Sequence, residues 1–305
     1  MSNFSSIQPD PGMIGGIAQP PYARLPDPAT LFSARARRLA HLAGESELKP
    51  YLVFLSALSD AQSAIQSDLP PVELPDADSL ARSAEHAMPP LDRGRFTLDA
   101  AFDATLERLL EAARAIEKPR EAEEALARVI AAGPVARDAM VRNVLADSLP
   151  MESLAEHLLV TAALQVHFTR LAAGLDADRL ARVADGACPC CGGPPLASIV
   201  VDWPSAPGAR YCGCALCGTL WNHVRVRCVV CGSTKGIGLQ EIEGGAGTVK
   251  AETCDECRSY VKVMYQAKDA GVEPLADDVA SLGLDLLMRD GPYRRGAFNP
   301  FLLGY

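Results

Sequence analysis

Four pairs of cysteines, each with two residues between its members, gather in the segment 188–257. The pairs are Cys188 and Cys191, Cys214 and Cys217, Cys228 and Cys231, and Cys254 and Cys257. Adding 40 to every position in the first two pairs gives the last two, so each half reads C-x2-C-x22-C-x2-C. Four thiolates are a ligand set for tetrahedral zinc or for a single iron ion. The repeat therefore predicts two mononuclear metal sites, one in each half.

The short spacing within each pair has a chemical reason. Two intervening residues let one tight turn present both sulfurs to a single ion, and backbone N–H groups in that turn can stabilise their charge. Glycine follows three of the pairs, as Gly192, Gly218 and Gly232, where it permits a positive φ. Arg258 stands at the fourth place. The 22-residue spacers are expected to form hairpins, so each half resembles a zinc-ribbon or rubredoxin-type module.

The grouping of the cysteines has alternatives. The pairs could combine in an interleaved way, first with third and second with fourth, but sequential combination is favoured because each half then closes alone. All ten cysteines lie between Cys188 and Cys257, and disulfides are disfavoured in a chain that shows no export signal. Cys190 and Cys212 have no counterpart in the repeat. They are either buried spare thiols or an alternative ligand or redox-active thiol near the first site.

No second set of residues carries a recognisable chemistry. The five histidines are His41, His86, His157, His167 and His223. His157 and His167 share one expected helix but lie ten residues apart, which is not the spacing of a ligand pair. The sequence has no nucleophile elbow, no P-loop and no dinucleotide fingerprint. Because a metal with four protein ligands has no open position for a substrate, the sequence predicts a protein that is not an enzyme.

Composition and charge narrow the function classes further. The chain has 305 residues and a formal net charge of −9. An acidic surface does not attract phosphate backbones, so nucleic acid is not an expected partner. No apolar run reaches the roughly 18 residues that a membrane-spanning helix needs. Residues 1–19 lack a basic segment followed by an apolar core, so no signal peptide is expected and a cytoplasmic location is predicted.

The elements that must position the cysteines divide the chain into five expected parts, which together predict an α+β multidomain protein. Residues 1–29, rich in Pro and Gly, are expected to form an irregular arm. Residues 30–184 are expected to form an α-helical domain, with Thr30 as N-cap and helices at 31–42, 51–65, 97–116, 120–131, 136–147, 151–174 and 176–184. Residues 185–226 and 227–268 are the two rubredoxin-like modules, with strands at 198–202, 224–227 and 260–264. Residues 269–305 are a C-terminal helix, at 275–289, and a tail.

The residues around the cysteines are similar to those of a known family. The order CPCCG, YCGCALCGTLW, RVRCVVCG and ETCDECRSYVKV, after an α-helical half, resembles the formate dehydrogenase accessory protein family (FdhE). The stretch ARARRLAHLA…LKPYLVFLSALSDAQ and the ending NPF are also similar, so the resemblance covers nearly the whole chain. It implies a cytoplasmic protein that is needed for active formate dehydrogenase. It also implies binding of the exported molybdenum- or tungsten-containing catalytic subunit before twin-arginine transport, and rubredoxin-like iron held by the eight paired cysteines.

Three functions are compatible with these observations. The leading one is a non-catalytic accessory protein, a maturation and export-proofreading chaperone that binds the formate dehydrogenase catalytic subunit and carries two four-cysteine sites with iron or zinc. The second is a rubredoxin-like electron carrier, although such carriers are usually small and lack a large helical domain. The third is a zinc-ribbon adaptor in transcription or RNA metabolism, which the acidic balance of the chain disfavours.

Overall fold

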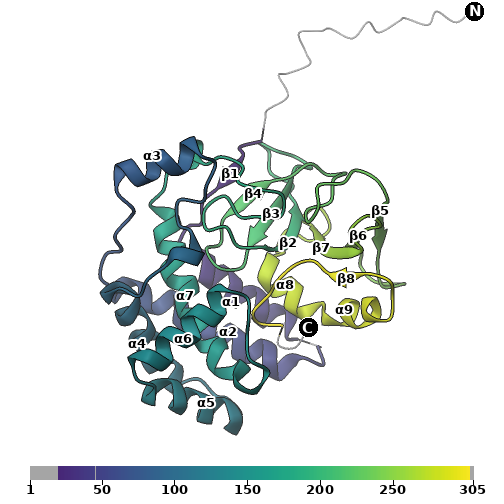
Figure 1. Cartoon of the computed structure of the whole chain (residues 1–305). Helices are drawn as coiled ribbons and strands as arrows, with labels where there is room; N and C mark the ends of the chain where they lie inside the picture. The colour runs from purple at the N-terminus through teal and green to yellow at the C-terminus, as the bar shows by residue number, and fades with distance from the viewer. Residues whose placement is uncertain (1–19, 45, 303–305) are drawn as a thin grey trace, which may run out of the picture.

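Seven α-helices form the N-terminal half of the described structure, a computed structural model of residues 20–44 and 46–302 (Figure 1). Residues 1–19 of the expected arm lie outside the described residues, as do Glu45 and residues 303–305. The helices are α1 (Leu31–Leu42), α2 (Lys49–Ala64), α3 (Ala77–Glu85), α4 (Ala100–Arg114), α5 (Arg120–Ala131), α6 (Pro134–Leu145) and α7 (Leu154–Ala173). Short 3₁₀ turns lie at Ile65–Asp68, Arg93–Arg95, Met151–Ser153 and Ala177–Arg179.

Helix α7 is the centre of this half. Nearly every side chain along it is buried, polar ones such as Gln165 included, because other helices pack on several of its sides. Helices α4, α5 and α6 each pack on α7, and α1 packs on α2. Asp99 caps the N-terminus of helix α4, since its carboxylate accepts a hydrogen bond from the N–H of Phe102. Proline in the first turn of α2 and α6 occupies positions whose N–H would lack a partner within the helix.

Both cysteine-rich halves contribute strands to one sheet. The strands are β1 (Ala23–Arg24), β2 (Pro195–Val200), β3 (Arg210–Cys214), β4 (Leu220–Asn222), β5 (Ile237–Gln240), β6 (Val249–Cys254), β7 (Ser259–Tyr265) and β8 (Arg294–Arg295). Their order is β1-β4-β3-β2-β7-β6-β5, with β8 beside β7. Strands β2–β4 form one antiparallel meander, and β5–β7 form a second about 40 residues later in the chain. The two meanders meet where β2 pairs in parallel with β7.

Two short helices, α8 (Pro274–Ala280) and α9 (Leu282–Arg289), complete the fold. Helix α8 joins the two halves of the molecule, since it packs on α1 as well as on β2 and β7. One continuous hydrophobic core extends from α7 through the first four paired cysteines to α8. The expected α+β class is thus confirmed. Within the described residues, no helix is both long enough and apolar enough to cross a membrane.

Three expected helical features are wrong in detail. The segment 176–184 is not a helix, because the carboxylate of Asp176 accepts the N–H of Asp178 and the chain becomes extended after a single 3₁₀ turn. Thr30 stands at the N-cap position of α1, but its hydroxyl donates to Asp27 and accepts no N–H from the first turn of the helix. The expected C-terminal helix is divided at Ser281, whose carbonyl and hydroxyl oxygens accept hydrogen bonds from Lys262.

The strands follow the β-branched runs only where a partner strand is available. The segments 198–202 and 260–264 overlap β2 and β7. The segment 224–227 is not a strand, and Val224 and Val226 are 63% and 64% exposed. The backbone of this segment instead forms a turn, in which the carbonyl oxygens of Arg225 and Arg227 face the guanidinium of Arg210. Helix α3 was not anticipated, because it lies between two proline-rich breaks.

Candidate metal centres

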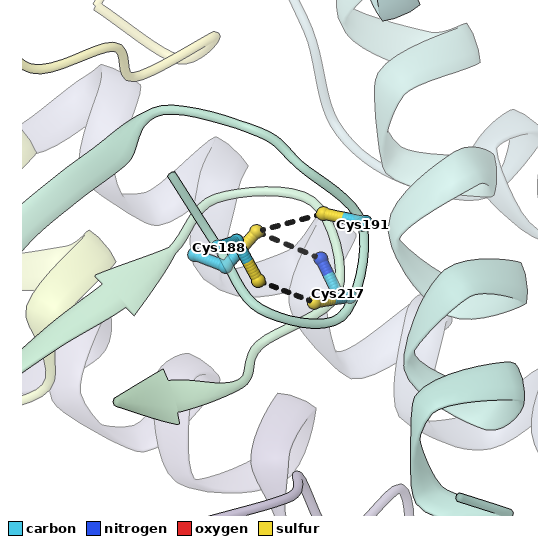
Figure 2. Close-up of side chains that lie close together, drawn as sticks. Cys188, Cys191 and Cys217 are labelled. Atoms are coloured by element: carbon cyan, nitrogen blue, oxygen red, sulfur yellow. Dashed lines mark hydrogen bonds between the residues drawn. The ribbon is translucent and has the colours of Figure 1, made fainter. Parts of the chain in front are cut away.

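The first cysteine set consists of Cys188, Cys191, Cys214 and Cys217. Their sulfurs lie within 4.8 Å of one another. The Sγ atoms of Cys188 and Cys217 are 3.6 Å apart, and those of Cys191 and Cys214 are 3.4 Å apart. Figure 2 shows the sulfurs of Cys188, Cys191 and Cys217 turned toward one another from two facing turns. A tetrahedron of sulfurs about 2.3 Å from one ion has edges of about 3.8 Å, so these residues fit a single tetrahedral ion.

The second cysteine set consists of Cys228, Cys231, Cys254 and Cys257, and it repeats this geometry. Its four sulfurs also lie within 4.8 Å of one another. Both facing pairs, Cys228 with Cys257 and Cys231 with Cys254, are 3.7 Å apart. The structure therefore brings together the two sets that sequential combination of the pairs predicts. In both sets all four donors come from the protein, which leaves a bound ion no open position.

The turns that carry the cysteines have the backbone that the glycines suggested. Gly192, Gly218 and Gly232 have φ values of +77°, +73° and +72°. Arg258, at the fourth position, adopts the same left-handed region with φ +54°. In each half, the N–H of the first cysteine donates to the carbonyl five residues ahead, at 2.8 Å for Cys188 and 2.7 Å in the second set. The repeat in sequence is thus a repeat in backbone geometry.

Three sequence models of one family match nearly all of the described chain. The FdhE N-terminal model matches residues 20–185, the FdhE central domain 187–225, and the FdhE C-terminal domain 226–302. The chain belongs to the FdhE family. The matched segments include the helical half and both cysteine sets.

Individual FdhE proteins are similar over their whole length. A protein of Rhizobium meliloti (strain 1021), named Protein FdhE homolog, is 50% identical over 99% of this chain and 100% of its own. One of the same name from Stutzerimonas stutzeri (strain A1501) is 34% identical over 96% of each chain. The crystal structure of the FdhE protein from Pseudomonas aeruginosa superposes with a TM-score of 0.82 at 31% identity. That match covers 93% of this chain and 99% of the other.

The two unpaired cysteines of this FdhE chain both lie near the first set without joining it. Cys190 contacts the hydroxyl of Thr219 at 3.2 Å, and the same hydroxyl lies 3.2 Å from the sulfur of Cys217. Cys212 is 3.7 Å from the hydroxyl of Ser198, and burial raises the pKa of its thiol to about 11. A thiol with that pKa is neutral at pH 7, so Cys212 behaves as a small apolar residue. The hydroxyl of Thr219 thus contacts both Cys190 and Cys217, which is a member of the first set.

The histidines of this FdhE chain do not contribute to either set, and no histidine joins a metal-binding group among the described residues. His223 Nε2 lies 3.1 Å from the carbonyl oxygen of Arg227, and burial lowers the pKa of its imidazole to about 4. His167 lies among aromatic rings that include Phe96 and Phe102. Burial also lowers its pKa to about 4. Both side chains are neutral at pH 7 and belong to the packing of the protein.

Several residues that position the first set were not apparent in the sequence. Leu91 donates its N–H to the carbonyl of Cys190 at 2.8 Å, and Arg93 donates to the carbonyl of Cys191 at 3.2 Å. Gln165 on α7 donates its amide to the carbonyl of Ala215 at 2.7 Å. These residues come from the helical half, far away in sequence. No local pattern distinguishes them, because each acts through a backbone contact that only the tertiary fold creates.

A buried ion pair joins the two modules of the FdhE sheet. Arg210 on β3 is 1% exposed and Glu252 on β6 is 8% exposed. The guanidinium of Arg210 lies 2.8 and 2.9 Å from the two carboxylate oxygens of Glu252. It also donates to the hydroxyl of Ser198 at 2.9 Å. Because a buried charge that loses its partner is costly, this pair favours a fixed arrangement of the two cysteine sets.

Proposed function

We propose that this chain is a formate dehydrogenase accessory protein that binds the catalytic subunit in the cytoplasm during its maturation, before export. Membership of the FdhE family over residues 20–302 is the observation that carries this proposal. The two closed cysteine sets support a non-catalytic role, because four protein ligands leave no position for a substrate. On this view the protein acts by holding its client and does not transform it.

The eight paired cysteines are proposed to hold two metal ions, one in each set. The bound ion, iron or zinc, would cross-link two turns that lie at the open end of one β-hairpin, formed by β2 and β3 in the first set and by β5 and β6 in the second. Burial raises the pKa of the Cys188 thiol well above its usual range, so metal binding has to displace protons there. The metal-loaded modules then present rigid turns at one end of the sheet, and these are proposed to shape the client-binding surface.

The experiment that tests this function is capture of the tagged full chain from cells that express formate dehydrogenase. The expected result is recovery of the catalytic subunit by the wild-type protein, with close to two metal ions per chain. Cys214→Ser and Cys254→Ser, which occupy equivalent places in the two sets, are expected to lower both metal content and recovery of the catalytic subunit. Deletion of the gene is expected to lower formate dehydrogenase activity and to leave its transcription unchanged.

Two outcomes would contradict the proposal. Recovery of ribosomes or RNA polymerase without formate dehydrogenase would favour the zinc-ribbon adaptor. A content of less than one metal ion per chain in native protein would contradict the proposal that each cysteine set holds an ion. Colour gives a direct control for the identity of the ion, since an oxidised iron in four thiolates absorbs visible light and zinc does not.

A further inference from the structure

The two cysteine sets differ in their access to solvent. All four cysteines of the first set are buried, with 3% exposure or less. In the second set Cys231 is exposed and Cys257 is half-buried, whereas the other two are buried. Cys191 and Cys231 hold equivalent places in the repeat. The equivalent ligand is therefore buried in the first cysteine set and exposed to solvent in the second.

The helical half covers the first set. The hydrogen bonds from Leu91 and Arg93 to the first turn, and from Gln165 to the second, anchor both turns to other parts of the chain. Gly218 lies so close to α1 that a Cβ atom built on it would be 2.7 Å from the side chain of Leu31. The four sulfurs belong to the same continuous core as α7. An incoming ligand can reach an ion in this set only after that core has opened.

The second set is bounded on one side by residues of its own module. The turn at 228–231 is closed by Cys228, which donates its N–H to Ser233 at 2.7 Å, and by Arg227, whose Nε donates to Gly232 at 2.9 Å. Three residues of the opposite turn, Asp255, Glu256 and Arg258, are exposed. Displacement of one ligand here requires only local motion of a surface turn. Local opening of surface segments costs far less free energy than opening of the core.

We propose that the second set is an exchangeable metal site, which releases and rebinds its ion in the folded protein, with Cys231 as the first ligand to detach. The first set retains its ion until the helical half unfolds. In the exchange step the metal–sulfur bond to Cys231 breaks, and a bond from the metal to an incoming chelator or thiolate forms. The released thiolate takes a proton from water, and the oxidation state of the metal does not change. This inference rests on the proposed metal sites.

The test uses the zinc-loaded full chain and the chromogenic chelator 4-(2-pyridylazo)resorcinol under native conditions. One zinc per chain is expected to leave at least about 100-fold faster than the other, because surface and core segments differ in opening free energy by several kcal/mol. Circular dichroism at 222 nm should stay unchanged after the fast phase. Alkylation at that point, read by mass spectrometry, should modify the second set and spare the first.

Cys231→Ser and its repeat equivalent Cys191→Ser are the matched variants. Cys231→Ser is expected to lose the fast phase and to retain the slow one, with its helical signal intact. Cys191→Ser is expected to lose the slow phase; if that variant fails to fold, alkylation of the wild-type protein still decides the order of release. Release of both ions in one phase, or early alkylation of the first set, would overturn the proposal that only the second set exchanges its ion. Neither result would contradict the presence of two metal sites. Native protein without metal would overturn the metal sites themselves.

Discussion

Lys262 on β7 provides a sharp test of how the C-terminal helices are held to the sheet. Its side chain has no exposed surface. The ammonium donates to the carbonyl of Asp278 at 2.7 Å and to the carbonyl of Ser281 at 3.1 Å. It also lies 2.5 Å from the carboxylate of Asp285. Arg295, in the tail, contacts the carboxylates of both aspartates at 2.5 Å. Two cations thus face two buried carboxylates, and their charges balance.

Substitution of Lys262 by Met keeps most of the side-chain stem and removes one of the two cations. Asp278 and Asp285 would then share Arg295 as their one remaining cation in this cluster. Removal of one member of a buried, hydrogen-bonded ion pair costs about 3–5 kcal/mol. Burial raises the pKa of Asp278, but Lys262 and Arg295 outweigh it and hold the pKa below its usual value. The lowered pKa reflects the same attraction, so loss of the Lys262 charge should bring the pKa of Asp278 back up and is part of the cost given above.

The assay is urea unfolding of the metal-loaded protein, followed by circular dichroism. The matched control is Lys250→Met on the neighbouring strand β6, where the ammonium lies 2.8 Å from Glu241 but both side chains reach solvent. An exposed pair contributes about 1 kcal/mol or less, so the control should stay close to wild type. Addition of Asp285→Asn to Lys262→Met should recover part of the loss, because it removes the unbalanced charge. Equal losses for Lys262→Met and Lys250→Met would refute the reasoning.

Two further predictions concern a glycine and a histidine. Gly218→Ala should destabilise the protein by about 3 kcal/mol, because a positive φ and a Cβ only 2.7 Å from Leu31 add strain and overlap. Gly244→Ala, with φ +74° and open space around it, should cost only the φ strain of about 1 kcal/mol; equal values in urea unfolding would contradict this. For His167, burial lowers the folded pKa to about 4 from 6.5, so the unfolded state gains protons first as the pH falls. Between pH 7 and 5.5 the free energy of unfolding of the wild type should accordingly fall by roughly 1 kcal/mol more than that of His167→Leu. Equal pH dependence of the two unfolding free energies would contradict this prediction.

The cysteine sets could be predicted from sequence because all of their information is local or periodic. The pair spacing specifies a turn, and the 40-residue repeat specifies which turns combine. The left-handed backbone of Arg258 was not predicted, because its residue type disfavours that conformation, yet Arg258 occupies the place that glycine holds in the other three pairs. Helix α4, with apolar residues at regular spacing along one face, was predictable for the same reason as the cysteine sets. The division of the chain into five parts, by contrast, stays a prediction.

What the sequence did not reveal depends on contacts between distant segments. The run at 224–227 has strand-like residues, yet it has no partner strand and turns toward Arg210. The break at Ser281 depends on Lys262, which is 19 residues away on a strand. The unequal burial of the two cysteine sets could not be read from two halves with the same ligand spacing. It arises because the helical half packs on one module, and a local repeat carries no information about which one.

The parallel pairing of β2 with β7 has a consequence for self-association. These two strands are not equivalent in the repeat, so the junction is head-to-tail and has no symmetry that would close it. A second chain could in principle continue the same junction by placing its own β5 edge against β4, and contacts of that kind propagate into filaments. Strand β1 already occupies β4, with Ala23 opposite Trp221 and Arg24 opposite Leu220. Two residues that precede the first helix thereby remove the edge on which such a polymer would grow.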